Sequence, residues 1–237
     1  MALLDLRWHL RAWRAQARWE HTRESIRQWL LQAPDTFDDL LLFGASAGWM
    51  MPDDFLARFR RIDAIDFEWA ASPLFRLRHR RVIAQGRIEV NFHRAEALSN
   101  LEQFLALRPR ALVLFDNVLG QYTLTCRNIP AAEAALSALK TRLAARSWGS
   151  VHDALSGSGR RMNDRHPQVM HLAPGQAWPE HPMLDQVGAT GSWGDHLTRE
   201  VLPATVPSRL IAWQLTPGYW HWLQAGWVIQ DASDRSS

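Results

Sequence analysis

The sequence predicts a three-layer α/β/α fold, built on a doubly wound, mostly parallel seven-stranded sheet that ends in a C-terminal antiparallel hairpin. Short apolar runs alternate with helical segments from residue 38 onward, which is typical of strand–helix units in a parallel sheet. Two apolar runs near the C-terminus, 208–215 and 219–230, flank Thr216-Pro217-Gly218, which indicates a hairpin turn. With 237 residues, the chain is long enough to bury one substantial core.

The expected strands share a short apolar run that stops at a small or polar residue. They are 39–43, 61–67, 87–92, 111–115 and a fifth at 150–155. Residues 3–32 predict one continuous helix, because neither Gly nor Pro interrupts them before Pro34. Pro130 is expected to open a second long helix that reaches about Arg146.

These elements predict a helical N-terminal extension over residues 1–34 and an α/β domain over 35–237. Within that domain, residues 156–206 are rich in Pro and Gly and show no clear period. We expect them to form an irregular, lid-like insertion, because long connections of this kind often cover a functional site.

Composition narrows the classes of partner. The chain carries 27 basic and 24 acidic residues, and a net charge of +3 argues against a nucleic-acid partner. The single Cys126 excludes an internal disulfide. No apolar run approaches membrane-spanning length and no signal peptide is evident, so we expect a cytoplasmic protein without a membrane partner. Four arginines share one face of the N-terminal helix, which is either solvated or bound to a protein partner: Arg7, Arg11, Arg14 and Arg18.

A turn made only of small residues follows the first expected strand. It reads Gly44, Ala45, Ser46, Ala47 and Gly48, directly after Leu41-Leu42-Phe43. Small side chains allow a ligand to approach the backbone closely, although a tight strand-to-helix turn has a similar composition.

Polar residues stand where the other parallel strands end. Asp66 ends the second strand, Glu96 follows the third, and Asp116-Asn117 follows the fourth. Ligands of open α/β sheets bind at these carboxyl ends. Asp66 and Glu96 could instead serve the start of the following helix, and Asp116-Asn117 could form a turn.

Candidate catalytic residues are His152, His196 and Asp116. His152 is followed by Asp153, but adjacent residues of a strand point to opposite faces, so the two side chains are not expected to touch. His221 on the hairpin is a further candidate base. The spacing of His166, His171 and His181 does not match a metal motif, so no metal is expected.

Over residues 38–230 this arrangement resembles the class I, Rossmann-like methyltransferases that use S-adenosylmethionine (SAM). The resemblance implies that the turn from Gly44 to Gly48 faces the methionine part of SAM. It further implies that Asp66 and the following Phe67 lie at the ribose, Glu96 near the adenine, and Asp116 and Asn117 beside the methyl group. The chain departs from the family at Leu41-Leu42-Phe43, where an acid that holds the amino group of SAM is usual.

The function expected from this resemblance is SAM-dependent methyl transfer to N or O of a small or peptidyl acceptor. The alternative is a non-catalytic scaffold or partner subunit that binds another protein, through the arginine-rich helix for example. A nicotinamide-dependent oxidoreductase is disfavoured, because the glycines do not follow the Gly-x-Gly-x-x-Gly spacing.

Overall fold

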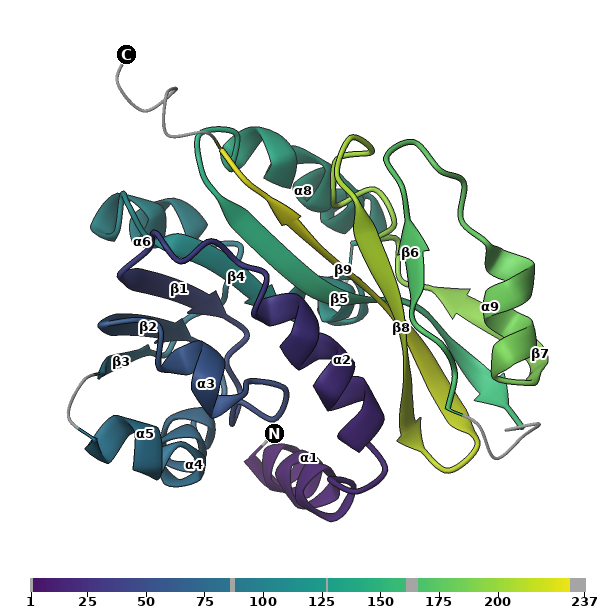
Figure 1. The fold of residues 1–237 in the computed structure, drawn as a ribbon, viewed down its shortest axis with the longest axis horizontal. Helices are drawn as coiled ribbons and strands as arrows, with labels where there is room; N and C mark the ends of the chain where they lie inside the picture. The colour runs from purple at the N-terminus through teal and green to yellow at the C-terminus, as the bar shows by residue number, and fades with distance from the viewer. Residues whose placement is uncertain (1, 86–87, 127, 161–165, 231–237) are drawn as a thin grey trace. The chain divides into compact units, whose positions relative to one another are not determined.

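The computed structural model describes residues 2–85, 88–126, 128–160 and 166–230 (Figure 1). The chain divides into two compact units. The first takes its residues from 1–16 and 27–116, and the second from 17–26 and 117–237. One helix, α2 (Glu20–Leu30), begins in the second unit and ends in the first. The expected domain boundary near residue 34 is therefore not one of the divisions between the units.

The first unit contains a parallel sheet of four strands in the order β3-β2-β1-β4. Its elements are α1 (Ala2–Arg14), β1 (Asp39–Phe43), α3 (Asp53–Leu56), β2 (Arg61–Ile65), α4 (Ala71–Arg78), α5 (Arg80–Ala84), β3 (Glu89–His93), α6 (Leu101–Leu107) and β4 (Leu112–Asp116).

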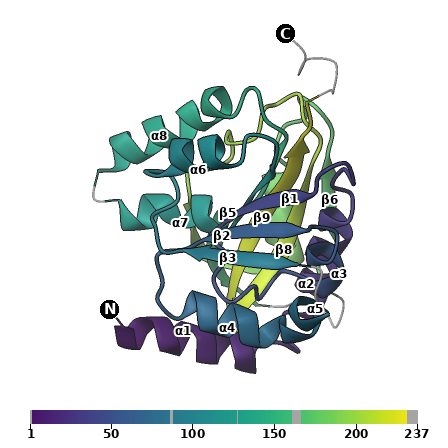
Figure 2. The ribbon, with the colours of Figure 1, turned by 90° about the vertical axis from the view of Figure 1, so that its left-hand side faces the viewer.

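Apart from Asp39 at the start of β1 and Asp116 at the end of β4, both strands are apolar, because both of their faces are covered. Figure 2 shows α6 on one side of strands β1 to β3, with α1 and α4 on the other. The ring of Phe43 stacks on Phe115 of β4, with centroids 5.1 Å apart, and meets Phe104 of α6 edge-on. Phe75 of α4 packs against Phe92 of β3. The first unit therefore has the three layers that the sequence predicts.

The second unit contains an antiparallel sheet in which β5 pairs with β7 and β9, β9 with β8, and β8 with β6. Its elements are α7 (Val118–Thr125), α8 (Ile129–Arg142), β5 (Trp148–Gly159), β6 (Met170–Leu172), α9 (Glu180–Gln186), β7 (Ala189–Asp195), β8 (Ser208–Thr216) and β9 (Tyr219–Val228). Trp220 and Trp222 of β9 pack with Met183 of α9 in its core.

The α/β class, the parallel strands and the closing β8–β9 hairpin are confirmed, but the expected count of seven strands is wrong. Within the described ranges, four strands lie in the first unit and five in the second. The additional strands, β6 and β7, lie within 156–206, which also contains α9 and the end of β5. Sequence analysis did not find them, because β6 has only three residues and β7, Ala189–Asp195, contains two glycines and shows no apolar alternation.

The single helix expected over 3–32 is also wrong, since α1 ends at Arg14 and α2 starts at Glu20. In the interruption, the indole Nε1 of Trp19 donates to the carbonyl oxygen of Gln214, 3.0 Å away. One turn later, Thr22 Oγ1 donates to the carbonyl oxygen of Ala212. These contacts with β8 are favoured over helix continuity, because both polar groups are buried from water.

Candidate functional site

The strand order of the first unit creates a topological switch point between β1 and β4. The chain moves outward from β1 to β2 and β3, and then returns to the other side of β1 to form β4. Open α/β sheets bind their ligands outside the carboxyl ends of the strands at such a point. Gly44, Asp66 and Asp116 stand at the carboxyl ends of β1, β2 and β4, as the sequence predicts.

The turn after β1 alternates between left-handed and ordinary backbone conformations. Gly44, Ser46 and Gly48 have φ angles of 78°, 44° and 63°. Ala45 and Ala47 between them are fully buried. A left-handed conformation is easy for glycine but strained for Ser46, so the surrounding structure must hold it in place.

Asp66 holds this strained residue. Its Oδ2 accepts a hydrogen bond from the backbone N–H of Ser46 at 2.7 Å, and its Oδ1 accepts one from the N–H of Glu68 at 2.9 Å. An ionised carboxylate has about four lone-pair positions, so these two bonds leave acceptor capacity for a ligand hydroxyl.

The hydroxyl of Ser46 is buried, and it forms no hydrogen bond with any residue that the structure describes. A buried polar atom without a partner costs free energy, so a ligand or a water that bonds this hydroxyl would stabilise the turn. Ser46 is thus the residue of the turn that most directly indicates binding.

Two buried carboxyl groups face the same end of the parallel sheet. Asp66 and Asp116 are each 9% exposed. Burial, only partly offset by the two backbone hydrogen bonds, raises the pKa of Asp66 to about 6. Burial together with the nearby charge of Asp66 raises the pKa of Asp116 to about 7. Within the described ranges the Asp116 carboxyl has no hydrogen-bond partner. A carboxyl group with a pKa near neutrality can take up a proton during a reaction.

The far end of the turn is filled by protein. A Cβ at Gly48 would collide with His79 Nε2 and would lie 2.9 Å from Cε2 of Phe75. The Trp49 indole donates to Nδ1 of His9 on α1 at 3.1 Å, and Nε2 of His9 lies 3.2 Å from a carboxylate oxygen of Glu68. A ligand at this turn would therefore meet Gly44 and Ser46 rather than Gly48.

Two other predicted site residues of the first unit have different surroundings. Both carboxylate oxygens of Glu96 accept backbone N–H groups, from Leu98 at 3.2 Å and from Ser99 at 2.6 Å. These N–H groups belong to the turn at 97–100, and α6 begins only at Leu101 after its N-cap Asn100, so Glu96 stabilises this turn rather than the start of the helix. The side chain of Phe67 is 51% exposed.

Three predicted residues lie in the second unit and already have hydrogen-bond partners there. Asn117 has a left-handed φ of 53°, and its amide bonds both the side chain and the backbone N–H of Asp153. His152 is fully buried between Ser150 and Gln224, and burial lowers its pKa to about 4, so the ring is neutral. His196 Nδ1 donates to the Gly120 carbonyl, and its Nε2 bonds Ser156 Oγ at 2.9 Å.

Sequence reasoning missed a carboxylate–imidazole pair in the second unit. Asp153 Oδ1 lies 2.9 Å from Nδ1 of His221 on β9. Burial by itself would raise the pKa of Asp153, but the charges of His221 and His196 and its hydrogen bonds lower the pKa below the ordinary value. The ionised carboxylate can only accept, so Nδ1 of His221 is the donor.

The other nitrogen of His221, Nε2, is buried and bonds to none of the described residues. An imidazole that a carboxylate orients and whose second nitrogen is free is the usual arrangement of a general base. His221 was a candidate from sequence, but its partner was not apparent because the two residues are 68 positions apart. As expected, Asp153 does not bond the adjacent His152.

The first strand ends without an acid, since Phe43 lies fully buried in the core of the first unit. Among the side chains that the structure describes, no group of three or more His, Cys, Asp or Glu residues could hold a metal ion. None of the helices in the same ranges is long and apolar enough to cross a membrane.

No protein-family model and no curated protein matches the chain. Among solved structures, magnesium protoporphyrin IX methyltransferase (ChlM) of Synechocystis PCC 6803 with bound SAM is 15% identical, with a TM-score of 0.46 over 86% of this chain and 77% of that one. N-methyltransferase NodS of Bradyrhizobium japonicum WM9, in complex with S-adenosylhomocysteine (SAH), is 13% identical, with a TM-score of 0.46 over 90% of each chain.

A protein of another activity is also similar. The tRNA N6-threonylcarbamoyladenosine dehydratase TcdA of E. coli, in complex with AMP, is 12% identical, with a TM-score of 0.37 over 62% of this chain and 61% of that one. All three likenesses are too distant to bear on function, and the candidate site is judged by its own geometry.

Proposed function

We propose that the chain binds SAM at the carboxyl ends of β1, β2 and β4 and transfers its methyl group to an N or O acceptor. The proposal is carried by Ser46, a strained residue with a buried, unpartnered hydroxyl at the topological switch point. The choice of SAM over another nucleoside ligand rests on the resemblance of the turn and of the acids that follow the strands to class I methyltransferases.

Ser46 would donate its hydroxyl hydrogen to the methionine part of SAM, close to the half-buried Gly44. Asp66 would accept hydrogen bonds from the two ribose hydroxyls with the lone pairs that Ser46 and Glu68 leave free. The end of β1 offers no acid for the amino group, because Phe43 is part of the core.

When bound, SAM supplies a methyl group that is activated by a positively charged sulfur. Asp116 would accept the proton that the acceptor N or O loses as it takes the methyl group, and SAH would be the second product. A pKa of about 7 suits this role, because the carboxyl is then partly ionised near neutral pH. His152 and His196 are given no part, since both ring nitrogens of each already have partners.

The proposal is tested by isothermal titration calorimetry with SAM and SAH on the full chain. We expect both to bind, and we expect Ser46→Ala and Asp66→Asn each to weaken binding about tenfold or more, as the loss of a buried hydrogen bond implies. Glu89→Gln is the matched control, because this carboxylate lies at the amino end of β3 in the same sheet. It should leave the affinity unchanged.

Absence of binding by both compounds to the wild-type chain would refute the proposal. That result would favour the alternative function, a non-catalytic scaffold or partner subunit that binds another protein. Equal weakening by Glu89→Gln would show that the carboxyl edge of the sheet is not the binding site.

A further inference from the structure

Helix α1 of the first unit carries large apolar side chains that are exposed. Leu6 and Leu10 are each 45% exposed, and Trp13 is 66% exposed. Their spacing of four and three residues places them along one face of the helix. The buried side of the helix includes His9, which borders this stripe, and Ala12, which lies further round the helix. An apolar stripe on the solvent side of a helix marks a binding surface rather than a core contact.

The loop after β2 extends this stripe. Phe67 is 51% exposed and Trp69 is 46% exposed. Glu68 between them lies 3.2 Å from His9 of α1, so the loop sits directly against the helix. We call Leu6, Leu10, Trp13, Phe67 and Trp69 together the α1 surface.

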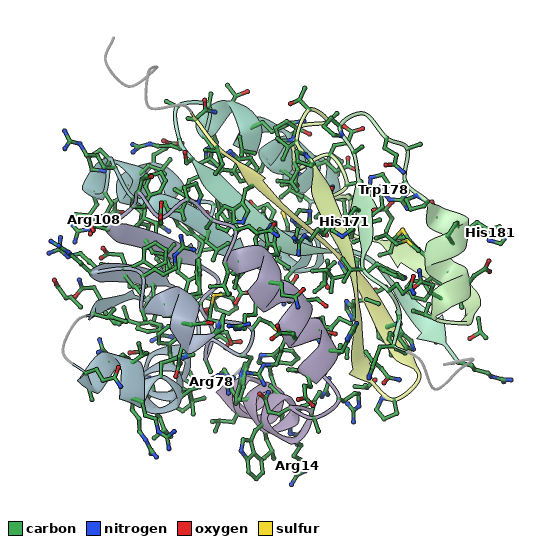
Figure 3. All side chains as sticks on the ribbon, in the orientation of Figure 1. Arg14, Arg78, Arg108, His171, Trp178 and His181 are labelled. Atoms are coloured by element: carbon green, nitrogen blue, oxygen red, sulfur yellow. The ribbon has the colours of Figure 1, made fainter. Side chains whose placement is uncertain are left out.

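Three arginines border the α1 surface. An α-helix turns by about 100° per residue. Around α1, the stripe of Leu6, Leu10 and Trp13 therefore lies between His9 on one side and the three arginines, Arg7, Arg11 and Arg14, on the other. All three are exposed, and none forms an ion pair with a side chain that the structure describes. Figure 3 shows Arg14 extending outward from α1. The helix thus offers an apolar stripe beside a cationic one.

We propose that the α1 surface binds an anionic lipid bilayer, with α1 lying in the plane of the membrane interface. Trp and Leu side chains beside a row of arginines are typical of interfacial helices, whose apolar face enters the headgroup region. The guanidinium groups would bind lipid phosphates, which accept their paired N–H donors. The solvent-facing side of a helix is convex, and a bilayer can deform around it without a matching groove.

This inference goes beyond the proposed methyl transfer and does not depend on it. It also departs from the expectation of no membrane partner, which rested on the lack of a spanning segment. An interfacial helix needs no such length. Exposed apolar side chains combined with basic side chains on one helix are sufficient for reversible membrane binding.

Co-sedimentation of the full chain with vesicles tests the proposal. We expect strong binding to vesicles of equimolar phosphatidylcholine and phosphatidylglycerol, weak binding to phosphatidylcholine alone, and loss of binding in high salt. The triple substitution Arg7→Gln, Arg11→Gln, Arg14→Gln should lower the partition coefficient on the order of a hundredfold. Leu10→Ser with Trp13→Ser should lower it about tenfold or more.

Matched control variants separate the α1 surface from total charge and total exposed apolar area. Arg110→Gln, Lys140→Gln, Arg160→Gln removes three positive charges elsewhere, and Leu31→Ser, Leu107→Ser removes two other exposed leucines, 37% and 46% exposed. Both controls should bind as the wild type does, and thermal unfolding checks that every variant folds.

Two outcomes overturn the proposal. One is a wild-type chain that stays in the supernatant with anionic vesicles at low salt. That result would favour an acidic protein as the partner of the α1 surface. The other is a control triple variant that loses as much binding as the α1 triple variant, which would reduce the effect to net charge.

Discussion

Gly48 shows at the scale of one residue how closely the turn after β1 is packed. Its φ of 63° is left-handed, and an added Cβ would collide with His79 and Phe75. Gly48→Ala therefore combines backbone strain with overpacking, and we expect it to reduce the free energy of unfolding on the order of 3 kcal/mol. Urea-induced unfolding measures this change.

Gly175→Ala is the matched control for Gly48→Ala. Its φ of 72° is similarly left-handed, but no atom lies within 4 Å of the added Cβ, so only the backbone strain remains. We expect a loss of about 1 kcal/mol. Equal losses in the two variants would mean that packing against α4 contributes nothing at Gly48.

At the scale of the element, the close contact between α7 and β5 positions the hydrogen-bonded residues Asp153, His196 and His221. A Cβ at Gly120 of α7 would lie 2.6 Å from the backbone nitrogen of Asp153 and 2.8 Å from its carbonyl oxygen. Because backbone atoms cannot rotate away, Gly120→Ala should push α7 from the strand and reduce the free energy of unfolding on the order of 2–3 kcal/mol.

The same displacement would disturb His196, whose Nδ1 donates to the Gly120 carbonyl. The imidazole signals of His196 and His221 in an NMR spectrum should therefore shift in Gly120→Ala. Gly194→Ala on β7 is the control, since its Cβ would meet only the Ser156 carbonyl oxygen at an ordinary 3.8 Å. A stable Gly120→Ala variant with unchanged imidazole signals would contradict the packing described here.

The stability of the whole molecule should depend on pH through its two buried carboxyl groups. The folded-state pKa values of Asp66 and Asp116, about 6 and about 7, exceed the ordinary value of 3.8. The folded state therefore binds more protons than the unfolded state between about pH 4 and 7. Over that window these groups lower the free energy of unfolding as pH rises, and above it their effect is constant.

Asp116→Asn removes the larger of these two effects without removing a hydrogen bond to a described residue. We expect the variant to be more stable than the wild type at pH 8, on the order of 3 kcal/mol, and no more stable below pH 4. Urea-induced unfolding across the pH range checks this, with the exposed Asp35→Asn as the control. If the free energy of unfolding of the wild type rose between pH 4 and 7 in parallel with that of the variant, the raised pKa of Asp116 would be contradicted.

The local sequence pattern was sufficient to predict the parallel strands and the residues at their carboxyl ends. The bounds of β1 agree with the prediction, and Asp66 and Asp116 stand where the strand ends place them. A strand covered on both faces is mostly apolar, so its limits are visible in the sequence. The strained conformation of Ser46 was not visible, because it depends on the carboxylate of Asp66.

Contacts between distant residues could not be predicted in this way. Trp19 lies where a sequence suited to one continuous helix is interrupted, and the carbonyl oxygen that accepts its hydrogen bond is 195 positions away. Strands β6 and β7 pair through backbone groups that every residue possesses. Asp153 pairs with His221 rather than with its neighbour, because antiparallel pairing brings β5 and β9 together.

The sequence by itself determined the α/β class, the four parallel strands and the polar residues at their ends, because apolar periodicity and the positions of acids are local properties. Tertiary structure alone decided which of those residues are free to bind. Among the described residues it left the Ser46 hydroxyl and His221 Nε2 without hydrogen-bond partners, while His152 and Asn117 bond residues far along the chain. Whether a polar group is satisfied depends on what packs beside it, and only the fold determines that.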